Sequence, residues 1–171
     1  MIIKIKSIKD RLNRVRSSGW KQYASCGLGI DRHQFKMDPP LTELQAAAFE
    51  KEHSIALPSD YRSFLLEVGN GGAGPYYGIL PLSRWNDAGD GLLSAEFSLD
   101  DPSKGAITIC EQGCTYYSLL IVTGKDRGKV GNYDMQSREV SLSPFNNFVG
   151  WYNGWLDLVL KKEKIEWFGY Q

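Results

Sequence analysis

One stretch, residues 57–82, constrains the fold of this chain more than any other; it reads LPSDYRSFLLEVGNGGAGPYYGILPL. Pro58 suits the first turn of a helix, because its missing N–H would have no partner there anyway. The apolar side chains that follow recur at the helical period and share one face: Tyr61, Phe64, Leu65 and Val68. Gly69 and the glycine-rich run after it end the helix. Residues 79–82 then predict an edge strand or a strand start, because Pro81 cannot donate to a ladder.

The same stretch carries a longer motif. Its residues are Leu57, Pro58, Asp60, Tyr61, Phe64, Leu65, Asn70, Gly71, Gly72, Gly74, Pro75, Gly78 and Leu82. This pattern, best matched over residues 41–85, resembles the core motif of the SUKH superfamily, which includes bacterial immunity proteins and a fungal regulator of cell-wall assembly. The resemblance implies an α+β fold and a protein partner, since family members can bind toxin domains, many of them nucleases. A shared fold does not by itself fix the function.

Size and charge narrow the class of protein further. A chain of 171 residues with 42% hydrophobic residues suits one domain with a substantial core. We expect a single domain over residues 1–171, with a core over 41–160 and an N-terminal helix and loop over 1–40 that elaborate it. Twenty basic and twenty acidic residues balance, which argues against a dedicated nucleic-acid coat. No apolar run approaches the ~20 residues of a membrane span. The charged N-terminus lacks the apolar centre of a signal peptide, so the sequence predicts a cytoplasmic protein without membrane contact.

Cysteines and histidines are too few to suggest a metal site or a disulfide framework. The three cysteines are Cys26, Cys110 and Cys114, and the two histidines are His33 and His53. An odd number of cysteines does not form a disulfide framework. The pair at 110 and 114 has no second pair to complete a zinc site. We therefore expect reduced thiols, no metal and no cofactor.

The chain before the motif predicts two helices and a connection. Apolar residues at 5, 8, 12 and 15 alternate with basic ones, which indicates an amphipathic helix that ends near residues 17–19. Its basic side is either solvated or faces an acidic partner. Residues 20–40 predict a surface connection, in which Trp20 and Tyr23 pack on the core or serve a partner. Thr42 and Gln45 fit a capping box for the next helix, and its expected buried side is Leu41, Leu44 and Ala48.

The C-terminal half turns to strands. Alternating or β-branched runs predict strands near residues 106–113, 116–122, 129–133 and 139–142, joined by short turns. Strands joined in this way pair antiparallel. Ser143 and Pro144 predict the start of a last helix that extends to residue 160. We therefore expect an α+β domain with an antiparallel sheet of about five to six strands, flanked by N-terminal helices and a C-terminal helix.

The sequence offers little for catalysis. Residues 70–74, NGGAG, read as a turn or as a cradle of N–H groups for an anion, but no basic residue follows to neutralise a phosphate. The loop carboxylates of Asp87, Asp90, Asp100 and Asp101 either form turns or supply paired acids for hydrolysis. We expect no catalytic residue, and a small hydrolase that uses these carboxylates stays as an alternative of a different class.

A binding surface is the remaining hypothesis. Aromatic and polar residues flank the glycine-rich turn and the end of the first long strand: Tyr76, Tyr77, Trp85, Asn86, Asp87, Asp90 and Glu111. Aromatic rings surrounded by polar groups have the composition of interface hot spots, and the alternative is that the rings pack the loop onto the sheet. An acidic rim of Asp87, Asp90 and Glu111 would complement a basic nuclease.

Taken with the resemblance, these residues predict an immunity-type protein that binds a cognate toxin domain and occludes it stoichiometrically. A protein-interaction regulator without a toxin partner is the first alternative, because the same fold supports it.

Overall fold

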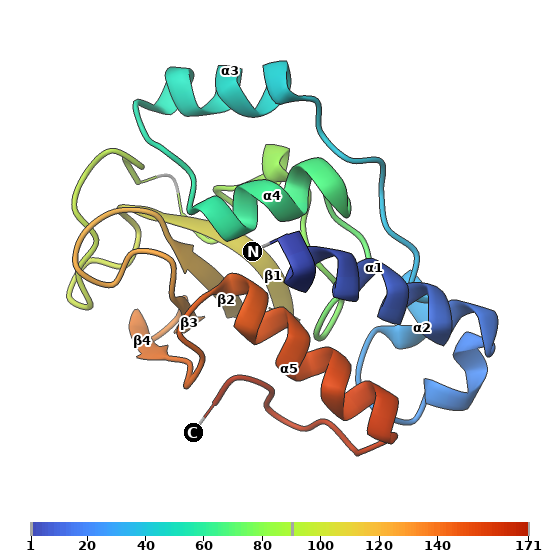
Figure 1. Cartoon of the computed structure of the whole chain (residues 1–171). Helices are drawn as coiled ribbons and strands as arrows, with labels where there is room; N and C mark the ends of the chain where they lie inside the picture. Colours follow the sequence, from blue (N-terminus) through green and yellow to red (C-terminus); the bar gives the residue numbers. More distant parts are fainter. Residues whose placement is uncertain (1, 90, 171) are drawn as a thin grey trace.

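The computed structural model describes residues 2–89 and 91–170 and combines helices with one antiparallel sheet (Figure 1). Its helices are α1 (Ile2–Ser17), α2 (Ile30–His33), α3 (Glu43–His53), α4 (Ser59–Glu67) and α5 (Phe148–Lys161). Its strands are β1 (Ala106–Gly113), β2 (Tyr116–Ile121), β3 (Val130–Asp134) and β4 (Glu139–Leu142). Short 3₁₀ turns occupy Trp20–Tyr23 and Leu82–Arg84. The α+β class is therefore confirmed. None of the described helices is long and apolar enough to cross a membrane.

The sheet has four strands among the described residues, in the order β1-β2-β3-β4, rather than the five to six expected. The difference arises beside β1, where residues 79–82 were expected to form a strand. Ile79 makes only isolated bridges, to Gly72 and to Cys110, and the Leu80 N–H donates to the Ile109 carbonyl at 2.8 Å. Pro81 follows, has no N–H, and prevents the pairing from continuing.

One face of the sheet is covered by α1, α4 and α5, and the main core lies between them (Figure 1). The aromatic rings of α5 fill this layer: Phe148 lies 5.0 Å from the Phe64 ring and Tyr152 lies 4.8 Å from it. Trp151 and Trp155 are almost fully buried on the same helix. Large aromatic rings dominate the energetics of such a core, so α5 is the helix whose packing most stabilises the domain.

The start of α5 differs from the prediction at Ser143 and Pro144. The Ser143 N–H donates to the Val130 carbonyl at 2.9 Å, so this residue still belongs to the sheet edge. Asn147 caps the helix instead, and its side chain accepts from the Gly150 N–H at 2.8 Å. A backbone bond to β3 therefore outweighed the local cap signal.

A second, smaller core covers the opposite face of the sheet. It contains Phe97 and Ala88 from the long loop before β1, packed on Leu119, Ile121 and Tyr133. The Thr108 hydroxyl accepts from the Ala88 N–H at 3.1 Å and holds the loop against β1. Both faces of the sheet are therefore partly covered.

Helix α3 stands away from the body of the molecule (Figure 1). The predicted capping box of Thr42 and Gln45 is present. The predicted buried side is wrong at two of its three positions, because Leu44 is 80% exposed and Ala48 is exposed. Leu41 does pack half-buried against the main core, and Ala46 is buried instead of Ala48. Polar contacts tether the helix: the Arg62 guanidinium of α4 pairs with the carboxylates of Glu43 and Glu50 on α3. The apolar contacts of the helix come from a different face than predicted, through Ala46, which is buried, and Phe49, which packs against the main core.

The connection expected over residues 20–40 is more structured than predicted, with α2 and a 3₁₀ turn inside it. Tyr23, Ile30 and Phe35 are buried in the main core, and Trp20 packs partly buried against it. The core-anchoring alternative for these aromatic side chains is therefore the one the structure supports.

Candidate functional site: a cleft beside the motif turn

The motif residues pack against one another. Gly78 has a φ of +100°, and a Cβ there would lie 2.3 Å from the Gly72 carbonyl oxygen. Gly72 has a φ of +107° and is similarly pressed against the Lys36 carbonyl. Only glycine fits such close backbone approaches in this conformation. These glycines are therefore required by the turn itself.

Two polar motif residues hold neighbouring elements. The Asp60 carboxylate on α4 accepts from the Val149 N–H at 3.0 Å and so caps the first turn of α5. The Asn70 side-chain oxygen accepts from the Leu82 N–H at 2.8 Å and fixes the exit of the turn. The first contact joins residues 89 positions apart, and the second joins the two sides of the glycine-rich turn.

The turn does not form an anion cradle. The N–H groups of Asn70, Gly72 and Ala73 donate to the carbonyls of Pro39, Ile79 and Lys36. Amide groups already bonded in this way are not free to bind a phosphate. The turn interpretation of residues 70–74 is therefore the one that fits.

The predicted binding residues fall into two separate groups. Tyr76, Tyr77 and Glu111 lie together at the end of β1, where the Tyr77 N–H donates to the Glu111 carbonyl at 3.5 Å. The Arg32 guanidinium lies over the Tyr77 ring, 4.3 Å from its centroid. The Tyr76 hydroxyl donates to the Phe168 carbonyl at 3.0 Å, and burial raises the pKa of that hydroxyl, so it remains a donor.

The second group lies beside the start of β1. Trp85 is half-buried, its ring 4.8 Å from the His53 ring of α3, and its carbonyl accepts from the Thr108 N–H at 2.7 Å. Asp87 forms an ion pair with Arg84, and Asn86 is exposed. The prediction for Asp90 lies outside the described residues. The acidic rim of Asp87, Asp90 and Glu111 is therefore not one continuous patch among the residues described.

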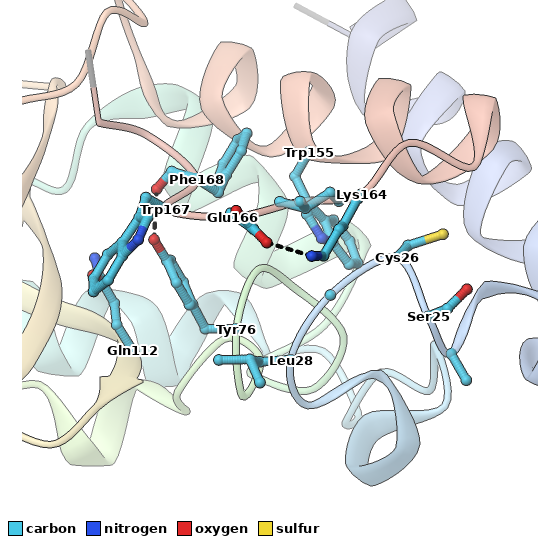
Figure 2. Close-up of a pocket in the computed structure, with 13 residues that line it drawn as sticks. Ser25, Cys26, Leu28, Tyr76, Gln112, Trp155, Lys164, Glu166, Trp167 and Phe168 are labelled. Carbon is cyan, nitrogen blue, oxygen red and sulfur yellow. Dashed lines mark hydrogen bonds and ion pairs between the residues drawn. The ribbon is translucent and has the colours of Figure 1, made fainter.

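A cleft of about 500 Å³ opens beside the first group (Figure 2). One wall is the loop 24–28, and the other is part of the C-terminal strap, which we define as residues 162–170. Figure 2 shows Tyr76, Trp167 and Phe168 on one side and Trp155 and Cys26 on the other, with the Lys164–Glu166 ion pair between them. Sequence reasoning identified Tyr76 here but missed Leu28 and Trp167, which are 60% and 62% exposed.

The walls of this cleft are fixed by direct contacts. The Ile165 N–H of the strap donates to the Cys26 carbonyl at 2.5 Å. Gly29, with a φ of +74°, lies so close to Tyr76 that a Cβ would be 2.2 Å from its carbonyl oxygen. The cleft is therefore formed before any ligand arrives, as most binding sites are.

A buried polar network lies under the strap. The Gln112 amide donates to the Ser118 hydroxyl and to the Asn132 side-chain oxygen, both at 2.9 Å. The Asn132 amide donates in turn to the Gly169 carbonyl at 2.7 Å, and the Tyr170 hydroxyl donates to Gln112 at 2.9 Å. Burial is the largest influence on the Tyr170 hydroxyl and raises its pKa to about 12. The sheet thus holds the strap through side chains that bind its backbone and its terminal ring.

A second, polar groove of about 960 Å³ lies on the other side of Trp167 and Tyr170. Its charged lining consists of Asp100, Asp101, Asp134, Glu139 and Arg138. Tyr116, which also lines the groove, has its ring 6.0 Å from the Trp167 ring, and the Trp167 ring is 5.7 Å from that of Tyr170. These three rings form a ridge between the apolar cleft and the acidic groove.

The charges of the chain are divided along the sequence. Residues 1–40 contain nine basic and three acidic side chains, a net charge of +6. Residues 41–171 contain eleven basic and seventeen acidic side chains, a net charge of −6. The neutral total therefore hides a basic N-terminal segment and an acidic remainder.

The sequence model of the SMI1/KNR4 family (SUKH-1) matches residues 40–154. This chain belongs to that family. The match begins just before α3 and ends within α5, so the SUKH-1 region contains the motif, the whole sheet and most of the acidic side chains. The family resemblance on the motif residues is thereby confirmed. No curated protein sequence matches the chain.

Both walls of the apolar cleft lie outside the SUKH-1 match. Residues 24–28 precede the matched region and residues 164–168 follow it, whereas Tyr76 and Gln112, which also line the cleft, lie within it. The cleft is thus made where the additional segments of this chain meet the family domain.

One of the four loop carboxylates, Asp101, is held in its ionised form. Hydrogen bonds from Lys104 and Ser103 lower the pKa of Asp101, which favours a solvated, ionised carboxylate rather than a general acid. Among residues 2–89 and 91–170, no group of three or more histidine, cysteine, aspartate or glutamate side chains is placed to hold a metal ion.

Proposed function

We propose that this SUKH-1 protein binds a cognate toxin domain in the cytoplasm and neutralises it stoichiometrically by covering its active site or substrate groove. The family supports a protein-interaction role of the immunity or regulator type. In this role no residue of the chain performs chemistry, and the association with the toxin supplies all of the inhibition.

The single observation that carries the proposal is the charge division of the chain. The SUKH-1 region and the strap have a net charge of −6, and an open groove lined by four carboxylates and one guanidinium lies among them. A nuclease binds a polyanion and therefore presents a basic surface. An acidic inhibitor surface steers such a partner and speeds its encounter.

Two surfaces are candidates for the contact. Tyr76 lines the apolar cleft, and Tyr77 and Glu111 are direct sequence neighbours of lining residues; the cleft adjoins the acidic groove across the Trp167–Tyr170 ridge. The other proposed contact residues follow the motif turn in sequence: Trp85, whose carbonyl is bonded near the opposite end of β1, then Asn86 and Asp87, and Asp90, which lies outside the described residues. We favour the first surface, because the rings of Trp85 and its neighbours Phe49 and His53 already pack together.

The test is affinity capture with the full chain from its native cell, followed by mass spectrometry. Recovery of a toxin domain in near-equal amount supports the proposal. Recovery of a set of housekeeping proteins instead favours the regulator without a toxin partner and overturns it.

Charge variants then test the acidic surface with the captured domain. Asp100→Asn with Glu139→Gln removes two exposed groove carboxylates that make no ion pair within the described residues. We expect association at low salt to slow by about tenfold, with the difference lost at high salt. The matched control is Glu52→Gln with Glu67→Gln, two exposed carboxylates on α3 and α4. Equal association rates for the groove and control variants would contradict the acidic-surface mechanism.

A further inference from the structure

The cleft between residues 24–28 and 164–168 has the properties of an interface pocket. Its volume of about 500 Å³ lies within the range of ligand sites. Leu28 and Trp167 stand on its rim with more than half of each side chain in contact with solvent. Exposed large apolar side chains gathered at a preformed cleft mark a site of contact with another molecule.

The backbone of the cleft is held in uncommon conformations. Tyr76 has a φ of +49° and Trp167 has a φ of +51°, in the left-handed region that bulky residues rarely adopt. Trp167 has this conformation although it is 62% exposed to solvent. Strain of this kind persists only where surrounding contacts impose it, and it concentrates at functional sites. Here those contacts include the Asn132 bond to Gly169 and the Tyr76 bond to Phe168.

The neighbouring groove indicates which partner fits. The ring of Trp167 contacts the rings of Tyr116 and Tyr170, and beyond them lie the carboxylates of Asp134 and Glu139. A partner seated on this ridge would meet an apolar cleft on one side and negative charge on the other. Charge complementarity therefore selects a segment in which an apolar side chain is flanked by lysine or arginine.

We propose that this cleft receives an apolar side chain from a basic segment of the protein partner, and that Trp167 is the main anchor of the contact. The proposal rests on the proposed function for the identity of that partner as a toxin domain. Because both walls lie outside residues 40–154, the pocket that determines partner choice belongs to the additional segments of this chain.

Short peptides test the cleft without knowledge of the natural partner. The probes are an acetylated and amidated five-residue peptide with one phenylalanine between two pairs of lysines, and the same peptide with serine for phenylalanine or glutamates for lysines. Titrations are followed by the amide and indole signals of the full chain in NMR. We expect the lysine–phenylalanine peptide to shift residues 24–28 and 164–168, with millimolar affinity and about tenfold preference over both other peptides.

Variants of the two rim residues test whether their side chains bind the peptide. Trp167→Ala and Leu28→Ser each remove an exposed side chain, so neither disturbs the core, and each should weaken the peptide by about fivefold or more. The matched control is Leu44→Ser on α3, which is 80% exposed and remote from the cleft. The proposal is overturned by the absence of shifts at these residues, by equal affinity for the three peptides, or by variants that bind like the control.

A captured toxin domain separates this inference from the proposed function. If the wild-type chain and Trp167→Ala bind that domain equally, the cleft is not the anchor, although the chain remains an inhibitor. If the peptides bind the cleft and no toxin domain is captured, the cleft stands and the proposed toxin partner fails.

Discussion

His33 makes the stability of this protein depend on pH in a defined direction. The imidazole is buried beneath the motif turn, its Nδ1 accepts from the Phe35 N–H at 3.0 Å, and its ring lies 5.9 Å from that of Trp155. Burial lowers its pKa from 6.5 to about 4, against smaller opposing effects of the Gly74 backbone and the Asp31 charge. The folded protein therefore excludes a proton that the unfolded chain accepts readily.

The sign and size of the effect follow from proton linkage. Between pH 6.5 and 4 the unfolded state binds more protons at this site, so the free energy of unfolding decreases as pH falls. The contribution of His33 to the free energy of unfolding is therefore unchanged above pH 6.5, falls between pH 6.5 and 4, and reaches its full loss below pH 4. The shift corresponds to about 3 kcal/mol over the whole window, of which about 2 kcal/mol is lost by pH 5.

The assay compares wild type with His33→Asn by guanidinium denaturation at pH 7.5 and at pH 5, read by the fluorescence of the five tryptophans. Asparagine has an acceptor oxygen placed to replace Nδ1, and it does not titrate. Carboxylates affect both proteins alike, so the difference between their pH dependences isolates His33. We expect wild type to lose about 2 kcal/mol more than the variant on going to pH 5. Equal losses would refute the burial argument.

Three further substitutions test the contacts of the motif and the strap. Asp60→Ala should lower the free energy of unfolding by ~1–2 kcal/mol in chemical denaturation, because α5 loses its cap, and Asp60→Asn should lie closer to wild type. An unchanged free energy for Asp60→Ala would show that the cap is dispensable. Gly78→Ala should lower the free energy of unfolding by more than ~2 kcal/mol, because the added Cβ meets a backbone oxygen. Gly128→Ala, also at positive φ but with no heavy atom within 4 Å of its Cβ, should lower it by about 1 kcal/mol, and equal decreases would mean that the close backbone contact does not matter. Asn132→Ala should destabilise by ~1–3 kcal/mol and speed proteolysis after residue 161, since the Gly169 carbonyl loses its donor; unchanged cleavage would refute this role.

Local signals predicted most of the secondary structure. The four strands appear within a few residues of their predicted ranges, because alternation and turn chemistry are both encoded within each segment. The capping box of Thr42 and Gln45 likewise needs only four consecutive residues, and it is present. Where one segment contains the whole interaction, the sequence is sufficient to predict it.

The predictions of secondary structure and burial are wrong where residues distant in the sequence determine the local structure. Ser143 has the side chain of a helix cap, but its N–H is taken by Val130 on β3, and α5 begins later with help from Asp60 on α4. Leu44 has an apolar side chain at a helical position, but ion pairs to Arg62 position α3 and leave Leu44 in solvent. Neither the partner nor the competing bond is visible from the local pattern.

The candidate site shows the same limit more strongly. Tyr76, Tyr77 and Glu111 were identified from their composition, and the structure places them together. The exposed partners of Tyr76 at the cleft, Leu28 and Trp167, come from loops with no periodicity, separated by more than half of the chain. The sequence offered one signal for this cleft, Trp167, because a tryptophan in a polar segment has no neighbouring apolar residues with which to form a core.

The position of the cleft gives a physical reason why one fold can serve different partners. The motif residues are occupied in building the turn, capping α5 and filling the core, so changing them destabilises the domain rather than its contacts. The walls of the cleft combine both kinds of residue: Cys26 and Phe168 are buried in the main core, whereas Leu28 and Trp167 are exposed on the rim. Exposed side chains on these walls can therefore change with little cost to the core. Partner choice is expected to vary there, while the motif turn stays fixed.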